Sequence, residues 1–245
     1  MSIIRGEMYK FRVSKTYHWI NLFIASVCVV YALYLKLMTD TTKDMFIRVE
    51  IPEKTELLLV IPLLFSFVFI DEYRFATIKN QIIMIGNRNR LILAKAVFQY
   101  AVTLISYAVA AGILVITYCI LPAGEEDQNV FFGNLVVFFL LFAIIILRAL
   151  AMINLLSVLS KSYLIVSLFF IIFVSLINLI LSVVGSYFDF AGKLIKYTLQ
   201  TEMTMLMKTV QNGEIAAFLE RNILVFAVIY CSICIGNFLK YKIKK

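Results

Sequence analysis

Arg148 is the most notable candidate for chemistry, because it is the one charged residue deep inside a long apolar run, IIILRALAMIN. A charge within a membrane is costly, so such a residue marks a functional site by default. The alternative is that its long side chain snorkels to the inner membrane surface. His18 is the only histidine of the chain, which excludes a two-histidine metal site, and we predict no metal site.

Other signals of enzymatic chemistry are weak. Cys231 and Cys234 form a C-x-x-C pair, but they lie in an apolar run without a positive neighbour that would activate a thiol. We interpret them as small packing residues. No G-x-x-x-x-G-K-[ST] sequence is present, so the chain cannot hold ATP phosphates by the usual loop. We therefore expect no catalytic residue, no enzymatic activity and no cofactor in this chain.

The elements that carry these residues are predicted to be membrane helices. The chain has 245 residues, of which 62% are hydrophobic and 16% charged, and its mean hydropathy is +0.95. A soluble domain is usually only about half apolar. We predict an all-α, polytopic membrane protein with a single transmembrane domain over residues 1–245. A span needs roughly 20 apolar residues, and six runs are predicted to cross: about 17–36, 57–70, 92–121, 131–158, 164–184 and 223–239.

Lysine and arginine predict the orientation. With the N-terminus inside, the inner segments hold fourteen of these residues and the outer segments eight. The middle outer loop, PAGEEDQ, has acids but no base. This excess of cations predicts that both termini are inside. We expect a multi-pass protein of a bacterial plasma membrane. The bases are scattered over the ends of the spans, so we expect no nucleic-acid partner.

Two segments outside the spans are predicted to lie along the membrane. Residues 1–16 have apolar residues at helical spacing, which favours an interfacial helix on anionic lipid over an unstructured basic leader. Residues 185–222 form the longest outer loop, where we predict two short amphipathic helices separated by a break at Gly213. An apolar group in this loop is a candidate for substrate contact, with packing on the protein itself or on lipid as the alternative: Met203, Leu206 and Met207.

The segment 71–95, DEYRFATIKNQIIMIGNRNRLILAK, lies between two predicted spans and is unusually polar and basic for a simple turn. We predict that 71–91 forms a short helix along the inner surface whose charged side can dock on a partner. Its residues 72–80, followed by Arg88 and Lys95, resemble the cytoplasmic loop of ABC-2 type transporter permeases, which reads roughly E-Y-x-x-G-T-I-K-N. Ala76 replaces the glycine of that pattern.

This resemblance implies that the chain is the transmembrane subunit of an ABC exporter. Segment 71–91 would then be the coupling helix that docks on a separate ATP-binding cassette ATPase, which binds ATP and Mg. The coupling residues implied are Glu72, Tyr73, Thr77, Lys79, Asn80 and Arg88. A second permease chain, the same or homologous, is also implied, together with a hydrophobic or amphipathic substrate such as a bacteriocin or cytolytic peptide. The alternative is an energy-independent membrane protein, either an ion carrier or an insertion or assembly factor.

Overall fold

The computed structural model describes residues 6, 8, 9, 12, 15–39, 41–51, 55–66, 70, 88–122, 128–160 and 162–242. Within these ranges side chains are described in most places, but not at 88–90 or from 231 onward. All regular structure in the described part is helical. The predicted interfacial helix over 1–16 lies largely outside the described residues. Of the predicted coupling segment 71–91, residues 71–87 also lie outside them.

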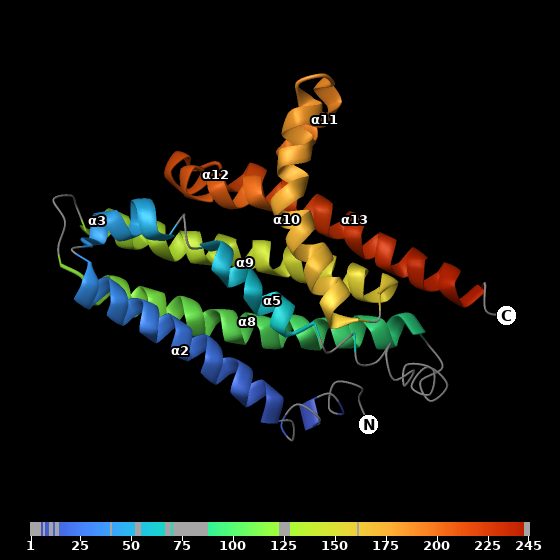
Figure 1. Ribbon diagram of the computed structural model, residues 1–245, viewed down its shortest axis with the longest axis horizontal. Coiled ribbons are helices and arrows are strands. Elements are labelled where there is room, and N and C mark those ends of the chain that lie inside the picture. Colours follow the sequence, from blue (N-terminus) through green and yellow to red (C-terminus); the bar gives the residue numbers. More distant parts are fainter. Residues whose placement is uncertain are drawn as a thin grey trace.

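Three long helices lie side by side along the longest axis of the molecule (Figure 1): α2 (Lys15–Met38), α8 (Arg88–Ile120) and α9 (Gln128–Leu159). Helix α9 is central, because 61% of the residues in its most apolar stretch are buried. The corresponding share is 44% for α8 and 17% for α2. Phe142 of α9 stacks on Tyr107 of α8, and the Tyr107 hydroxyl donates to the carbonyl oxygen of Phe139 at 2.7 Å. The exposed sides of α2 are apolar and suit contact with lipid.

Short helical pieces fill the connection after α2. They are α3 (Lys43–Met45), the π-helical turn η1 (Phe46–Glu50), the 3₁₀ turn η2 (Thr55–Leu59) and α5 (Val60–Leu64). The backbone N–H of Lys43 donates to the carbonyl oxygen of Pro122 at 3.1 Å, which ties α3 to the end of α8. The predicted span over 57–70 is not confirmed, because its described part is these short pieces rather than one helix. Pro62 has no N–H to continue a helical ladder, and buried Leu58 and Ile61 hold the stretch in the core instead.

Helix α10 (Tyr163–Gly185) crosses the direction of α8 and α9 steeply (Figure 1). Only 11% of the residues in its most apolar stretch are buried. Helix α11 (Asp189–Ile195) packs on α10, and α12 (Leu199–Asn212) packs on α9. Two short helices occupy the predicted stretch, but the break between them falls at 196–198, whereas the predicted break at Gly213 separates α12 from the next long helix. Gly213 ends α12 with φ 73°, a left-handed conformation that glycine adopts without strain, and α13 (Ile215–Lys242) follows along α9.

Four described helices are long and apolar enough to cross a membrane: Tyr17–Met38, Leu93–Ile120, Phe132–Ser157 and Tyr163–Gly185. These helices indicate a membrane protein. Six spans and their orientation are not confirmed. Helix α13 covers the predicted last span, 223–239, as a continuous helix, although its side chains are described only as far as Tyr230.

Candidate functional site

The predicted coupling residues can be placed only in part. Glu72, Tyr73, Thr77, Lys79 and Asn80 lie outside the described residues. Arg88 is the first residue of α8, where the backbone is described and the side chain is not. The described helix therefore includes the last part of the basic segment and continues for 33 residues without interruption.

Arg148 does not snorkel to an end of α9. Its side chain is 3% exposed and points toward α12 and α13. The guanidinium donates from Nη1 to Asn222 Oδ1 at 3.1 Å and from Nη2 to the carbonyl oxygen of Tyr197. Asn222 is held in turn by its own amide, which donates to the Phe218 carbonyl at 2.9 Å. Arg148 thus joins the central span to the polypeptide on both sides of α12.

A buried carboxylate lies beside this arginine. Glu202 of α12 is 1% exposed and accepts from Arg221 Nε at 2.8 Å, with a longer contact to Nη2 at 3.4 Å. This hydrogen bond raises the pKa of Arg221. Glu202 also attracts Arg148 through space. Glu202 therefore interacts with two guanidinium groups, with Arg221 by a hydrogen bond and with Arg148 through space.

The start of α12 is fixed to α10 by short polar side chains. Thr198 is the N-cap residue of α12, and its hydroxyl accepts from the backbone N–H of Thr201 at 3.3 Å. The Thr201 hydroxyl donates to Asn178 Oδ1 of α10 at 3.2 Å. Together with Arg148, these contacts attach α12 to both α9 and α10.

The predicted substrate-contact group packs against the protein itself in this conformation. Met203, Leu206 and Met207 are 4%, 0% and 7% exposed and belong to the core beneath α12, which packs on α9. Met205, on the other side of the helix, is 47% exposed. Contact between the buried group and a substrate would require α12 to separate from α9.

A row of buried polar side chains lies between α8 and α9, and the sequence pattern indicates only part of it. Asn154 donates to Gln99 Oε1 at 2.8 Å, and Gln99 donates to the Phe65 carbonyl at 2.9 Å. Thr103 Oγ1 and Asn154 Oδ1 have no hydrogen-bond partner among the described residues. Polar residues at helical spacing were the available signal on α8: Lys95, Gln99, Thr103 and Ser106, all at most 1% exposed.

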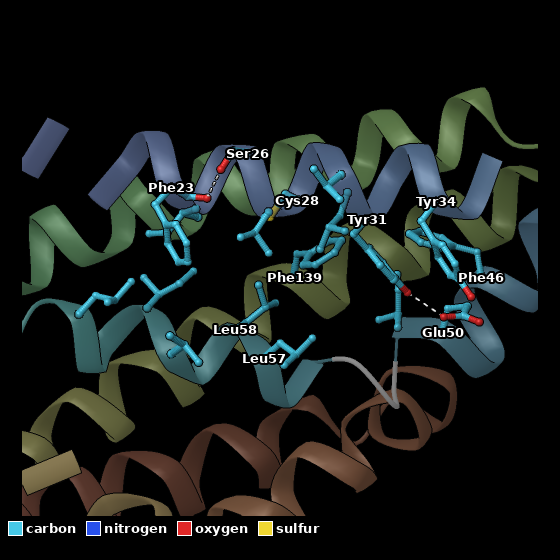
Figure 2. A pocket seen from close by; sticks show the side chains of 18 residues that line it. Phe23, Ser26, Cys28, Tyr31, Tyr34, Phe46, Glu50, Leu57, Leu58 and Phe139 are labelled. Carbon is cyan, nitrogen blue, oxygen red and sulfur yellow. Dashed lines mark hydrogen bonds between the residues drawn. The ribbon is translucent and has the colours of Figure 1, made fainter. Parts of the chain in front are cut away.

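An apolar pocket of about 670 Å³ lies between α2 on one side and η1, η2 and α5 on the other (Figure 2). Leu114 of α8 and Phe139 of α9 contribute to its lining. The Tyr31 hydroxyl donates to Glu50 Oε2 at 2.7 Å at one end of the pocket. Sequence reasoning missed Glu50, because no local pattern shows that its carboxylate faces α2.

No group of three or more His, Cys, Asp or Glu residues suited to a metal occurs in the described part of the chain. Comparison with protein-family models, with curated proteins and with solved structures gave no match.

Proposed function

We propose that this protein is the transmembrane subunit of an ABC exporter driven by a separate ATPase. The observation that carries the proposal is the polar segment 72–95, whose order E-Y-x-x-x-T-I-K-N, Arg88, Lys95 resembles the coupling loop of ABC-2 type permeases. Helix α8 supports it, because its described part includes residues 88–95 of this segment. Its 33 residues correspond to about 50 Å, longer than the roughly 30 Å of hydrocarbon that a span must cross.

In this proposal the ATPase supplies the work through α8. ATP and Mg bind to the partner, and closure of two ATPases moves the coupling helices over 71–91. Helix α8 passes the displacement to α9 and to the end of α5 through Gln99, which contacts Asn154 and the carbonyl oxygen of Phe65. Arg148 then links α9 to α12 and α13. The chain itself performs no catalysis.

A second permease chain completes the proposed assembly. Helix α10 is apolar, and its exposed side chains include Phe169, Ile172 and Leu179 at 57%, 48% and 60% exposure. Such a surface requires lipid or protein around it. A hydrophobic or amphipathic peptide is the proposed cargo, since few charged groups along the spans would serve a polar solute. Export takes place at the cell membrane.

Purification of the full chain from its native membranes in mild detergent tests the assembly. We expect an ATPase with a phosphate-binding loop to copurify, and Glu72→Lys or Arg88→Glu to lower its retention or its ATP turnover while membrane levels stay near normal. Glu125→Lys makes the same charge change as Glu72→Lys in the predicted outer loop and serves as the matched control. Unchanged retention and turnover in both coupling variants would show that Glu72 and Arg88 are ordinary solvated charges.

Cysteine labelling tests the orientation. In a background without the four native cysteines, Gly124→Cys should react with an impermeant reagent on intact cells. Asn89→Cys should react only after permeabilisation. Labelling of Asn89→Cys from outside would reverse the proposed topology.

Stimulation of the reconstituted complex tests the cargo class. A panel of membrane-active peptides should raise ATP turnover, whereas small ions and sugars should leave it at the basal rate. The opposite result would refute peptide export without removing the permease assignment.

The second candidate, an energy-independent ion carrier, is favoured by one observation, the row of buried polar side chains around Gln99 and Asn154. Its unpartnered oxygens, Thr103 Oγ1 and Asn154 Oδ1, could hold water within the span. Ion flux through liposomes that contain this chain alone would support the carrier, and flux only with the ATPase and ATP would support the exporter.

A further inference from the structure

The pocket between α2 and α5 has the shape of a binding site for one slender molecule. Its volume of about 670 Å³ lies in the range of ligand sites, roughly 300–1,000 Å³. Its walls are aliphatic and aromatic, and α2 contributes residues from Phe23 to Tyr34. The rise along α2 from Phe23 to Tyr31 is about 12 Å, at 1.5 Å per residue. The site is therefore long enough for an alkyl chain.

The mouth of the pocket is apolar as well. Phe23, Val30 and Leu57, which line it, are 56%, 65% and 63% exposed. Phe23 and Val30 lie within the candidate span Tyr17–Met38, so the pocket opens on a surface suited to lipid. A ligand that partitions into the membrane can therefore reach it from the side.

Glu50 gives the pocket one polar end. It is the only charged residue among the described residues that line the cavity. The carboxylate accepts one hydrogen bond from Tyr31 at 2.7 Å, and a carboxylate has about four acceptor positions. Glu50 ends the π-helical turn Phe46–Glu50, a type of turn that is frequent at functional sites. Figure 2 shows the Tyr31 and Glu50 side chains meeting at one end of the row of apolar side chains.

We propose that this pocket binds a single-chain amphiphile with a cationic head. The ammonium group contacts the Glu50 carboxylate, and the alkyl chain lies along α2 toward Phe23. Charge complementarity selects this occupant over an uncharged alkyl chain, which would leave Glu50, the one carboxylate among the described lining residues, without a cation. The proposal concerns binding alone and stands whether or not the protein is an exporter.

Trp19, the only tryptophan, provides the readout, because it lies one helical turn before Phe23. The full chain is placed in phosphatidylcholine nanodiscs and titrated with ω-bromoundecylamine, whose terminal bromine quenches tryptophan. The alcohol of the same chain, ω-bromoundecanol, is the uncharged control. We expect saturable quenching with the amine, and only a linear background with the alcohol.

Three variants locate the site. Glu50→Gln should weaken binding of the amine by about ten- to a hundredfold, the usual effect of losing a charged hydrogen-bond partner. Cys28→Phe, which fills the pocket but keeps the carboxylate, should also weaken it. Glu220→Gln removes an exposed carboxylate on α13 and should bind like the wild type. Elution in size exclusion checks that each variant is folded.

The outcomes separate the possible occupants. Equal saturable binding of amine and alcohol would mean that the pocket accepts any lipid chain, which overturns the selection for a cation. Amine quenching that is linear and unchanged by Glu50→Gln and Cys28→Phe would mean that the probe only partitions into the bilayer. A wild-type dimer that shields Trp19 and binds no amine would assign the face to a second copy and would also overturn the proposal.

Discussion

Removal of the Glu202 carboxylate should destabilise the protein more than removal of its direct partner Arg221. Glu202 is 1% exposed, Arg148 is 3% exposed and the Arg221 side chain is 32% exposed. Glu202→Gln leaves the buried Arg148 without the carboxylate that attracts it and leaves Arg221 with Glu214 alone. Arg221→Gln leaves the carboxylate with Arg148 still nearby and with an amide that can donate to it.

The expected magnitude lies between two limits. Breaking a fully buried pair by removing one partner costs about 3–5 kcal/mol, and an exposed pair contributes about 0–1 kcal/mol. Because Arg221 is one-third exposed, we expect Glu202→Gln to cost about 2–3 kcal/mol and Arg221→Gln about 1–2 kcal/mol. At roughly 2–4 °C per kcal/mol for a chain of this size, Glu202→Gln should lower the melting temperature by about 5–10 °C.

The assay is the apparent melting temperature in mild detergent, from fluorescence-detected size exclusion after heating. Glu220→Gln, an exposed carboxylate on α13, is the matched control and should melt like the wild type. The double variant Arg148→Gln with Glu202→Gln should lose less stability than the sum of the single variants, because the two charges interact. A larger loss for Arg221→Gln than for Glu202→Gln would refute the view that Glu202 interacts with both arginines.

Two further predictions concern packing and use the same melting assay. A Cβ atom at Gly185 would lie 3.0 Å from the backbone of Gly192, so Gly185→Ala should lower the free energy of unfolding by about 1–3 kcal/mol. A Cβ atom at Gly192 would lie 3.8 Å from its nearest atom, so Gly192→Ala should melt like the wild type. Equal melting of the two alanine variants would contradict the close crossing of α10 and α11. Leu206→Ala should cost about 2–5 kcal/mol because the side chain is 0% exposed, and Met205→Ala, at 47% exposed, should change stability by about 0.5 kcal/mol or less. A mild effect of Leu206→Ala would mean that α12 is not packed on α9, and would favour the substrate-contact role of this group.

The sequence by itself determined the long helices. The predicted spans 17–36, 92–121, 131–158 and 164–184 correspond to α2, α8, α9 and α10 within a few residues at each end. A run of about 20 apolar residues is a local signal, because every backbone polar group in lipid must bond within its own helix. The break at Gly213 was equally local, since glycine adopts the left-handed conformation that ends α12.

The tertiary structure decided what these helices bring together. The partners of Arg148 are Tyr197 and Asn222, which lie 49 and 74 positions further along the chain. No pattern within one segment records such pairs, because they depend on how α12 and α13 pack on α9. The predicted span over 57–70 was not confirmed for a related reason. Its residues are as apolar as those of a membrane span, yet packing against α2, α8 and α9 keeps them in short turns.

The pocket between α2 and α5 shows the same difference between what the sequence determined and what the tertiary structure decided. Composition alone determined that the chain is apolar, since 62% of its residues are hydrophobic, and the continuous apolar runs determined that it is helical. Neither determined that α2 and α5 leave a cavity between them, or that one carboxylate ends it beside Tyr31. Helix formation depends on neighbours along the chain, whereas a cavity depends on the shapes of side chains from six separate elements that meet only after folding.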